Sequence, residues 1–180
     1  MTSTWWFPDN TVLCNFATVN RLDIVRDVLR GRGRWVEAIE YEVQRSARYI
    51  PALACVASEG WLGEPIAIED PRVIETVSRT RRIVFDGTDD DPLQHLGESQ
   101  TCVLIKSDPQ FSESWWITDD RESIRYAQQQ GITTRETIDI VSTAVVEGTI
   151  GSEAAYELML QMKSMGRHLR VPGSAKELVL

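Results

Sequence analysis

Short apolar segments alternate with helical patterns along this chain of 180 residues, and this alternation limits the possible fold more than any other feature. Residues 4–8 (TWWFP) and 34–38 (RWVEA) predict strands, and a helical pattern follows each of them. The order strand, helix, strand, helix is typical of α/β proteins, in which helices cover a sheet of parallel strands. We therefore expect a three-layer α/β/α sandwich with a central parallel sheet of four to five strands.

The second half of the chain continues the pattern. Residues 115–118 (WWIT) predict a strand, 120–131 a helix that Gly131 ends, and 132–134 (ITT) a short final strand. Two further helices are expected at 137–148 and 152–166.

Length and composition indicate one ordinary globular domain over residues 1–180. No apolar run is long enough to span a membrane, and the first residues lack a secretory signal pattern, so we expect a cytoplasmic protein. Cys14, Cys55 and Cys102 lie in apolar runs without metal-ligand spacing and predict reduced core thiols.

The net charge of −8 disfavours a polyanionic ligand, because nucleic acids draw most of their affinity from contacts of lysine and arginine with phosphate. Arginines nevertheless gather at 21–34, 45–48 and 79–82, while acids gather in the loop 86–91. The sequence therefore remains compatible with a basic patch on one face.

Four acidic residues fall at boundaries between the expected elements. They are Asp9 after the first strand, Glu42 on the helix after the second, Glu98 at the start of a later helix, and Asp119 at the end of WWIT. Strand ends of a parallel sheet converge on one edge, where carboxylates repel one another unless a cation lies among them. Oxygen ligands without His or Cys favour Mg²⁺ or Mn²⁺, ions that support phosphodiester hydrolysis.

Two polar residues shortly after Asp9 fit such a site. Thr11 would add a hydroxyl near the ion or a phosphate, and Asn15 would orient Asp9 or another carboxylate.

Several segments resemble, in this order, the PIN-domain nuclease family. They are 9–25 (DNTVLCNFATVNRLDIV), 38–43 (AIEYEV), 96–101 (LGESQT), 117–132 (ITDDRESIRYAQQQGI) and 137–151 (TIDIVSTAVVEGTIG). The similarity is greatest to small prokaryotic proteins related to VapBC-type toxins. It leaves about residues 50–92 unmatched, where we expect an insertion or divergent helices.

The resemblance implies a PIN-like fold and a metal-dependent endoribonuclease, with RNA as substrate. Its motifs place the catalytic acids at Asp9, Glu42, Glu98 and Asp119, with Mg²⁺ or Mn²⁺ on Asp9, Glu98 and Asp119, a hydroxyl at Thr11 and a supporting carboxylate at Asp120. It also implies a small antitoxin partner and a homodimer, for which the apolar helix 154–162 is a suitable surface. Glu98 departs from the family, since many relatives carry Asp there.

Several acids also have simpler explanations. Asp9 and Asp120 each precede a helix and are placed to cap it. Glu37 and Glu40 are alternatives to Glu42 as the second acid, although the end of the matching motif favours Glu42.

Other residues near the expected site leave their roles open. Arg121 and Arg125 are one helical turn apart and would bind RNA phosphates or pair with nearby acids. Thr137 is expected to reach the site through its hydroxyl. His95 and His168 are expected at the surface and not as ligands.

A second hypothesis is a PIN-like scaffold that binds protein or RNA without hydrolysis. The acidic balance, the glutamate at position 98 and the unmatched segment motivate it. A receiver domain, another α/β fold with an acidic edge, fits less well because its acid pair follows the first strand.

Overall fold

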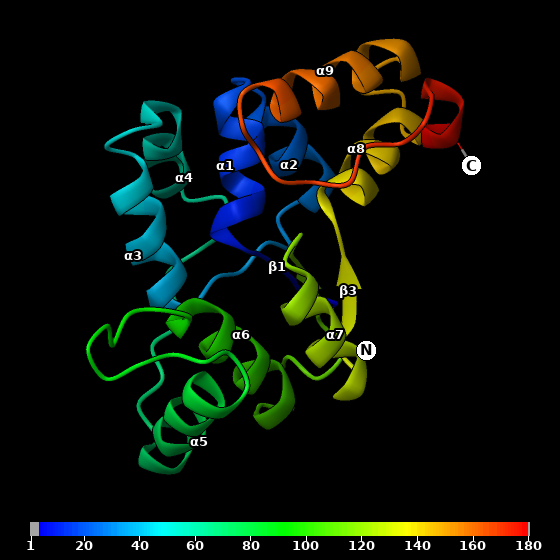
Figure 1. Ribbon diagram of the computed structural model, residues 1–180. Helices are drawn as coiled ribbons and strands as arrows, with labels where there is room; N and C mark the ends of the chain where they lie inside the picture. The colour runs from blue at the N-terminus through cyan, green and yellow to red at the C-terminus, as the bar shows by residue number, and fades with distance from the viewer. Residues whose placement is uncertain (1–3, 180) are drawn as a thin grey trace.

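The computed structural model describes residues 4–179, in which helices surround a small parallel sheet (Figure 1). In chain order the elements are β1 (Trp6–Pro8), α1 (Asn10–Thr18), α2 (Leu22–Leu29), α3 (Glu37–Ser46), η1 (Pro51–Leu53), α4 (Ala54–Glu59), α5 (Pro71–Ile83), α6 (Leu96–Ser107), β2 (Trp115–Ile117), α7 (Arg121–Gln129), β3 (Thr133–Arg135), α8 (Thr137–Val146), α9 (Ser152–Ser164) and η2 (Ala175–Val179). Figure 1 shows α1, α2, α8 and α9 on one side of the sheet, and α5 and α6 on the other. The expected α/β class is confirmed.

The three strands pair in the order β1-β2-β3, and both pairings are parallel. At their carboxyl ends, Pro8 is opposite Ile117, and Ile117 is opposite Arg135. This register brings the residues that follow each strand to one edge of the sheet.

The sheet is narrower than the expected four to five strands. Residues 34–38 form no strand, because Val36 already caps α3 and the chain leaves the sheet there. Only isolated bridges remain in this region, joining Trp6 to Gly33 and Val36 to Ile66. The expected second strand is therefore reduced to local contacts.

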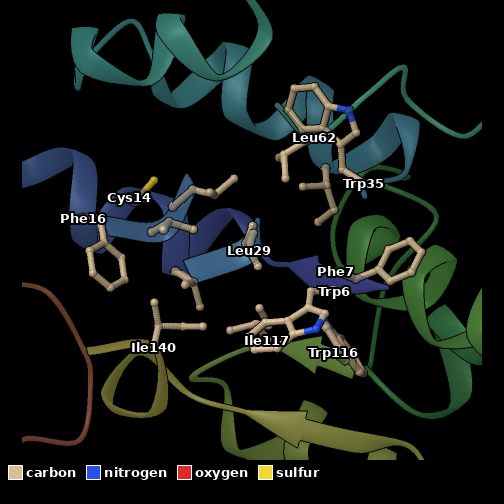
Figure 2. Packing of buried hydrophobic residues seen from close by; sticks show 14 of the residues in the cluster. Trp6, Phe7, Cys14, Phe16, Leu29, Trp35, Leu62, Trp116, Ile117 and Ile140 are labelled. Atoms are coloured by element: carbon tan, nitrogen blue, oxygen red, sulfur yellow. The ribbon is translucent and has the colours of Figure 1, made fainter. Parts of the chain in front are cut away.

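Large apolar side chains from β1 and β2 fill the space beneath the helices. Phe7 and Trp116 are each 1% exposed, and Figure 2 shows them among the buried side chains of the core. Trp5 and Trp115 are half-buried, and the guanidinium groups of Arg34 and Arg135 lie 3.7 and 4.5 Å from their ring centroids.

The apolar face of α9 packs within the chain. Its Ala155, Leu158, Met159 and Met162 are buried. Most of the apolar side chains that the sequence suggested for pairing two copies are therefore used in the core, while Leu160 is exposed.

Two further expectations concern thiols and membranes. Cys14, Cys55 and Cys102 are free, and the first and last of them are buried while Cys55 is half-buried. Within residues 4–179, no helix combines the length and apolar character needed to cross a bilayer.

Gly97 is needed for the close approach of α6 to α3. A Cβ atom added at this residue would lie 2.4 Å from Cδ1 of Ile39 and 2.7 Å from Oε1 of Glu42. Ile39 is only 2% exposed, so it has little room to move aside. We expect Gly97→Ala to lower the free energy of unfolding by about 1–3 kcal/mol through overpacking, measured by urea denaturation.

Gly151→Ala is the matched control, because a Cβ atom there would meet nothing within 4 Å. It should change stability much less than Gly97→Ala. Equal stability of the two variants would show that α6 and α3 are not held at this distance by packing.

Candidate functional site

The carboxyl edge of the sheet joins the starts of several helices. The backbone N–H of Asp9 donates to the carbonyl of Ile117, and that of Thr118 donates to the carbonyl of Arg135, each over 2.9 Å. Beyond these bonds α1, α7 and α8 begin, with Asp9, Asp120 and Glu136 as their N-cap residues. Acidic side chains are favoured here, since helix N-termini stabilise negative charge.

Asp9 is held deep in this edge and is 3% exposed. Its Oδ1 accepts a bond from the backbone of Asn10, and its Oδ2 accepts one from Oγ1 of Thr11, each over 2.8 Å. Oγ1 of Thr118 donates a longer bond of 3.4 Å to the same Oδ2. Asp9 is thus both the predicted helix cap and part of an acidic group.

Glu42 and Glu98 complete that group from α3 and α6. The carboxylate of Glu42 lies beside Gly97 at the start of α6, since a Cβ atom added at Gly97 would be 2.7 Å from Oε1 of Glu42. Among the described residues, Oε2 of Glu98 is buried and has no hydrogen-bond partner. Its Oε1 lies 3.4 Å from Nδ1 of His95.

Burial and neighbouring carboxylates disfavour the charged forms of Asp9 and Glu42. Burial and the neighbouring Glu98 raise the pKa of Asp9 to about 7. Burial and the charges of Asp9 and Glu98 raise the pKa of Glu42 to about 9. At neutral pH, Glu42 is therefore protonated and Asp9 only partly ionised unless a cation compensates their charge.

Asp119 is held separately by a set of donors. Its Oδ1 accepts a bond of 2.9 Å from the backbone N–H of Thr137, and its Oδ2 accepts from the Thr137 hydroxyl. Nδ2 of Asn15 donates to the same Oδ2 over 2.8 Å and to Oγ1 of Thr137 over 3.0 Å. Asn15 thus orients Asp119 and not Asp9. Burial raises the pKa of Asp119, and the Thr137 bonds oppose that rise.

A cleft of about 970 Å³ lies over this edge. Its lining includes the acids Glu98, Asp119, Asp120, Glu122 and Glu136, and the basic side chains Arg121, Lys163, Arg167, His168 and Arg170. Thr11 also lines it. The cleft therefore has negative and positive side chains in one space.

The other residues that the sequence predicted for the site do not all lie in the cleft. Asp120 accepts a bond from the backbone of Ser123 over 2.7 Å, so its predicted role as helix cap is confirmed. Arg125 does not line the cleft; it is exposed and lies 3.9 Å from Glu122. Glu42 lies beneath a separate, smaller hollow of about 260 Å³.

The alternatives to Glu42 are not in the acidic group. Glu37 is exposed and accepts a bond from Nε2 of Gln100 over 3.1 Å. Glu40 lies two positions before Glu42 on α3 and therefore faces another direction, whereas the charges of Asp9 and Glu98 help raise the pKa of Glu42. The geometry thus favours Glu42 as the neighbour of Asp9 and Glu98.

Sequence reasoning missed the basic side of the cleft. The segment 163–170 supplies Lys163, Arg167, His168 and Arg170, and Nε of Arg167 donates to Oδ1 of Asn15 over 2.9 Å. The sequence feature that could have indicated this basic segment is a group of four basic residues within eight positions of an acidic chain. His95 and His168, expected at the surface and not as ligands, both line the cleft.

The side chains of the edge fit a divalent cation in their chemistry. Carboxylate oxygens are the ligands that Mg²⁺ and Mn²⁺ prefer, and the unpartnered Oε2 of Glu98 leaves such an oxygen available. Among residues 4–179, however, no three His, Cys, Asp or Glu side chains are already gathered as a metal centre. The carboxylates are neighbours that a cation would still have to draw together.

Comparison with known proteins identifies one matching sequence family. A sequence-family model described as a PIN domain matches residues 6–176. Neither the curated proteins nor the solved structures contain a match to the chain.

Rising pH should destabilise the protein in the absence of metal. The folded-state pKa values of Asp9 (about 7) and Glu42 (about 9) exceed their ordinary values of 3.8 and 4.5, so the folded state binds more protons than the unfolded state. The stability linked to these groups is complete below the ordinary pKa values and is lost as the pH rises toward 9. We expect the Tm of the wild type in EDTA to fall more steeply from about pH 5.5 to pH 8.5 than that of Glu42→Gln.

Glu40→Gln, on the same helix, is the matched control and should keep the wild-type slope. Mn²⁺ should reduce the fall, because it favours the ionised carboxylates. A wild-type Tm whose pH dependence equals that of Glu42→Gln would contradict the electrostatic description of the site.

Proposed function

The chain belongs to the PIN-domain family, and from this premise we propose that it is a divalent-metal-dependent endoribonuclease that hydrolyses phosphodiester bonds of RNA. The observation that carries the proposal is the set of carboxylates at the carboxyl edge of the sheet, of which Asp9 is buried and Glu42, Glu98 and Asp119 are half-buried. Burial raises the pKa of Asp9, Glu42 and Asp119, and Glu98 keeps a buried oxygen without a partner among the described residues. A structural protein gains nothing from burying mutually repelling acids, whereas a metal-dependent nuclease needs them.

Each side chain of the edge has a distinct part in this proposal. Asp9, Glu98 and Asp119 would hold Mg²⁺ or Mn²⁺, with Glu42 adding negative charge behind Asp9. When bound, the ion supplies the Lewis acidity that phosphodiester hydrolysis requires. Thr11 fixes the carboxylate of Asp9 through its hydroxyl, and Thr137 fixes that of Asp119.

The basic side of the cleft supports a nucleic-acid substrate. Arg121 and Lys163 line the same cleft as the acids, and cationic side chains of this kind position phosphates. Arg170 lies 2.8 Å from Glu136, so part of its charge is already compensated. The overall charge of −8 does not prevent this local attraction, because solvent ions screen charges beyond about 10 Å.

We further propose that a small antitoxin partner suppresses the activity, as the resemblance to VapBC-type toxins suggests, and that the chain forms a homodimer. Because the apolar face of α9 is used within the core, the dimer would have to use another surface.

One observation favours the second candidate, a PIN-like scaffold that binds RNA or protein without cutting. The carboxylates of the described residues are not gathered as a metal centre, and the raised pKa of Glu42 keeps this residue neutral near pH 7. Such a protein would retain the basic side of the cleft and lose hydrolysis.

Purified wild-type protein should cut single-stranded RNA when Mg²⁺ or Mn²⁺ is added, and EDTA should stop the reaction. Asp9→Asn, Asp119→Asn and Glu98→Gln each remove an anionic ligand at nearly constant volume. Because supporting residues of metal sites already contribute about 10- to 100-fold to activity, we expect each change to lower the rate at least about 100-fold. Gel separation of end-labelled RNA measures the rate.

Asp90→Asn, in the exposed loop after α5, is the control and should cut like the wild type. If a folded Asp119→Asn variant kept the wild-type rate, the assignment of the site would be wrong. Cleavage of DNA in preference to RNA would overturn the proposed substrate while leaving the site in place.

Calorimetric titration with Mn²⁺ separates the two candidate functions. The nuclease should take up Mn²⁺ with a measurable heat, and Glu98→Gln should bind it at least about tenfold more weakly. The absence of any uptake by the wild type at millimolar Mn²⁺ would favour the scaffold.

A further inference from the structure

The segment after α9, drawn in orange-red in Figure 1, contacts the first turns of α1 through the side chain of Arg167. Nε of Arg167 donates to Oδ1 of Asn15 over 2.9 Å, and Nη2 donates a longer bond of 3.5 Å to the carbonyl oxygen of Thr11. Thr11 and Asn15 are four positions apart and share one face of the helix. The guanidinium group therefore spans one turn of α1.

Both residues that Arg167 contacts hold an acid of the site. The hydroxyl of Thr11 donates to Asp9, and the amide of Asn15 donates to Asp119, each over 2.8 Å. Arg167 is thus connected to Asp9 through Thr11 and to Asp119 through Asn15.

The bond to Asn15 has a direction that matters for Asp119. An asparagine amide carries a donor end and an acceptor end, whereas a guanidinium group only donates. Arg167 therefore requires the oxygen of the amide to face it, which turns the NH₂ group toward Asp119 and Thr137. Asn15 is 0% exposed, so water has no access to replace the lost donor.

Without Arg167, the buried Oδ1 of Asn15 would lose its donor. A buried acceptor without a partner is unfavourable, so the amide would shift toward other donors. The bond from its NH₂ group to Asp119 would then weaken, and the carboxylate would be held less firmly in the position set by Thr137.

From these contacts, and resting on the function proposed above, we infer that Arg167 is a positioning residue. It fixes the orientation of the Asn15 amide and through it the carboxylate of Asp119 on which a divalent cation would bind. Its effect passes through Asn15 and not through direct contact with RNA.

Arg167→Met keeps most of the side-chain length and removes the donors. We expect kcat for RNA cleavage to fall about 10- to 100-fold, the range for residues that support metal ligands, with KM for RNA nearly unchanged. Calorimetry should show weaker binding of Mn²⁺ by a similar factor. Arg167→Lys, which retains a donor, should recover part of both losses.

A double-variant cycle tests whether the effect passes through Asn15. In the Asn15→Ala background, Arg167→Met should cause little further loss of kcat or of Mn²⁺ affinity. If Asn15→Ala does not fold, the comparison of Arg167→Met with Arg167→Lys decides alone. Lys176→Gln, an equal charge loss in exposed η2, is the control and should change neither quantity.

Three results would overturn the inference. One is a rise in KM with unchanged kcat and Mn²⁺ affinity, which would make Arg167 a direct phosphate contact. Another is fully additive loss in the double variant, and the third is Arg167→Met with wild-type kcat and Mn²⁺ affinity.

Failure of the proposed function is a separate outcome. If the wild type binds Mn²⁺ but cuts no RNA, the Mn²⁺ affinities of the four proteins in the cycle decide the positioning role without it. If the wild type binds no Mn²⁺, both the proposed function and the inference fail.

Discussion

The parallel register of three short strands determines where the acids that follow these strands lie. Because Pro8, Ile117 and Arg135 are aligned across the sheet, the next residues of all three strands meet at one edge. Three helices begin directly at this edge, so its backbone N–H groups and helix N-termini favour anionic side chains. A shift of register by one residue would separate Asp9 from Asp119 and turn alternate strand residues to the wrong face.

The acids at the edge are governed by two different kinds of interaction, charge repulsion and hydrogen bonding. Asp9, Glu42 and Glu98 lie close enough that burial and mutual repulsion raise the pKa of the first two. Asp119 instead receives bonds from Thr137 and Asn15, which oppose the effect of burial. One part of the site is thus strained by its own charge, and the other is held in place by donors. A divalent cation would compensate the negative charge of Asp9, Glu42 and Glu98. It would also bind Asp119 in the position that the hydrogen bonds to this carboxylate fix.

The local parts of this arrangement could be predicted from the sequence. An apolar strand followed by Asp9 or by Asp119 and Asp120, and then by a helix, indicates the edge, the caps and the acids together. The narrower sheet could not be foreseen in the same way, because whether residues 34–38 continue as a strand depends on where α3 begins. Contacts between distant segments were also beyond local patterns: Arg167 reaches Asn15 only because α9 returns its end to α1. The place of His95 in the cleft was not predicted for a related reason, since the cleft is formed by segments that are distant in the sequence.

The central claim is that this edge gathers a divalent cation, and a crystal structure grown with Mn²⁺ tests it most directly. The account predicts an anomalous-scattering peak between Asp9, Glu98 and Asp119, with carboxylate oxygens at about 2.0–2.6 Å, as expected for hard divalent ions with oxygen ligands. Carboxylates unchanged in position, with Mn²⁺ bound only elsewhere on the molecule, would contradict it.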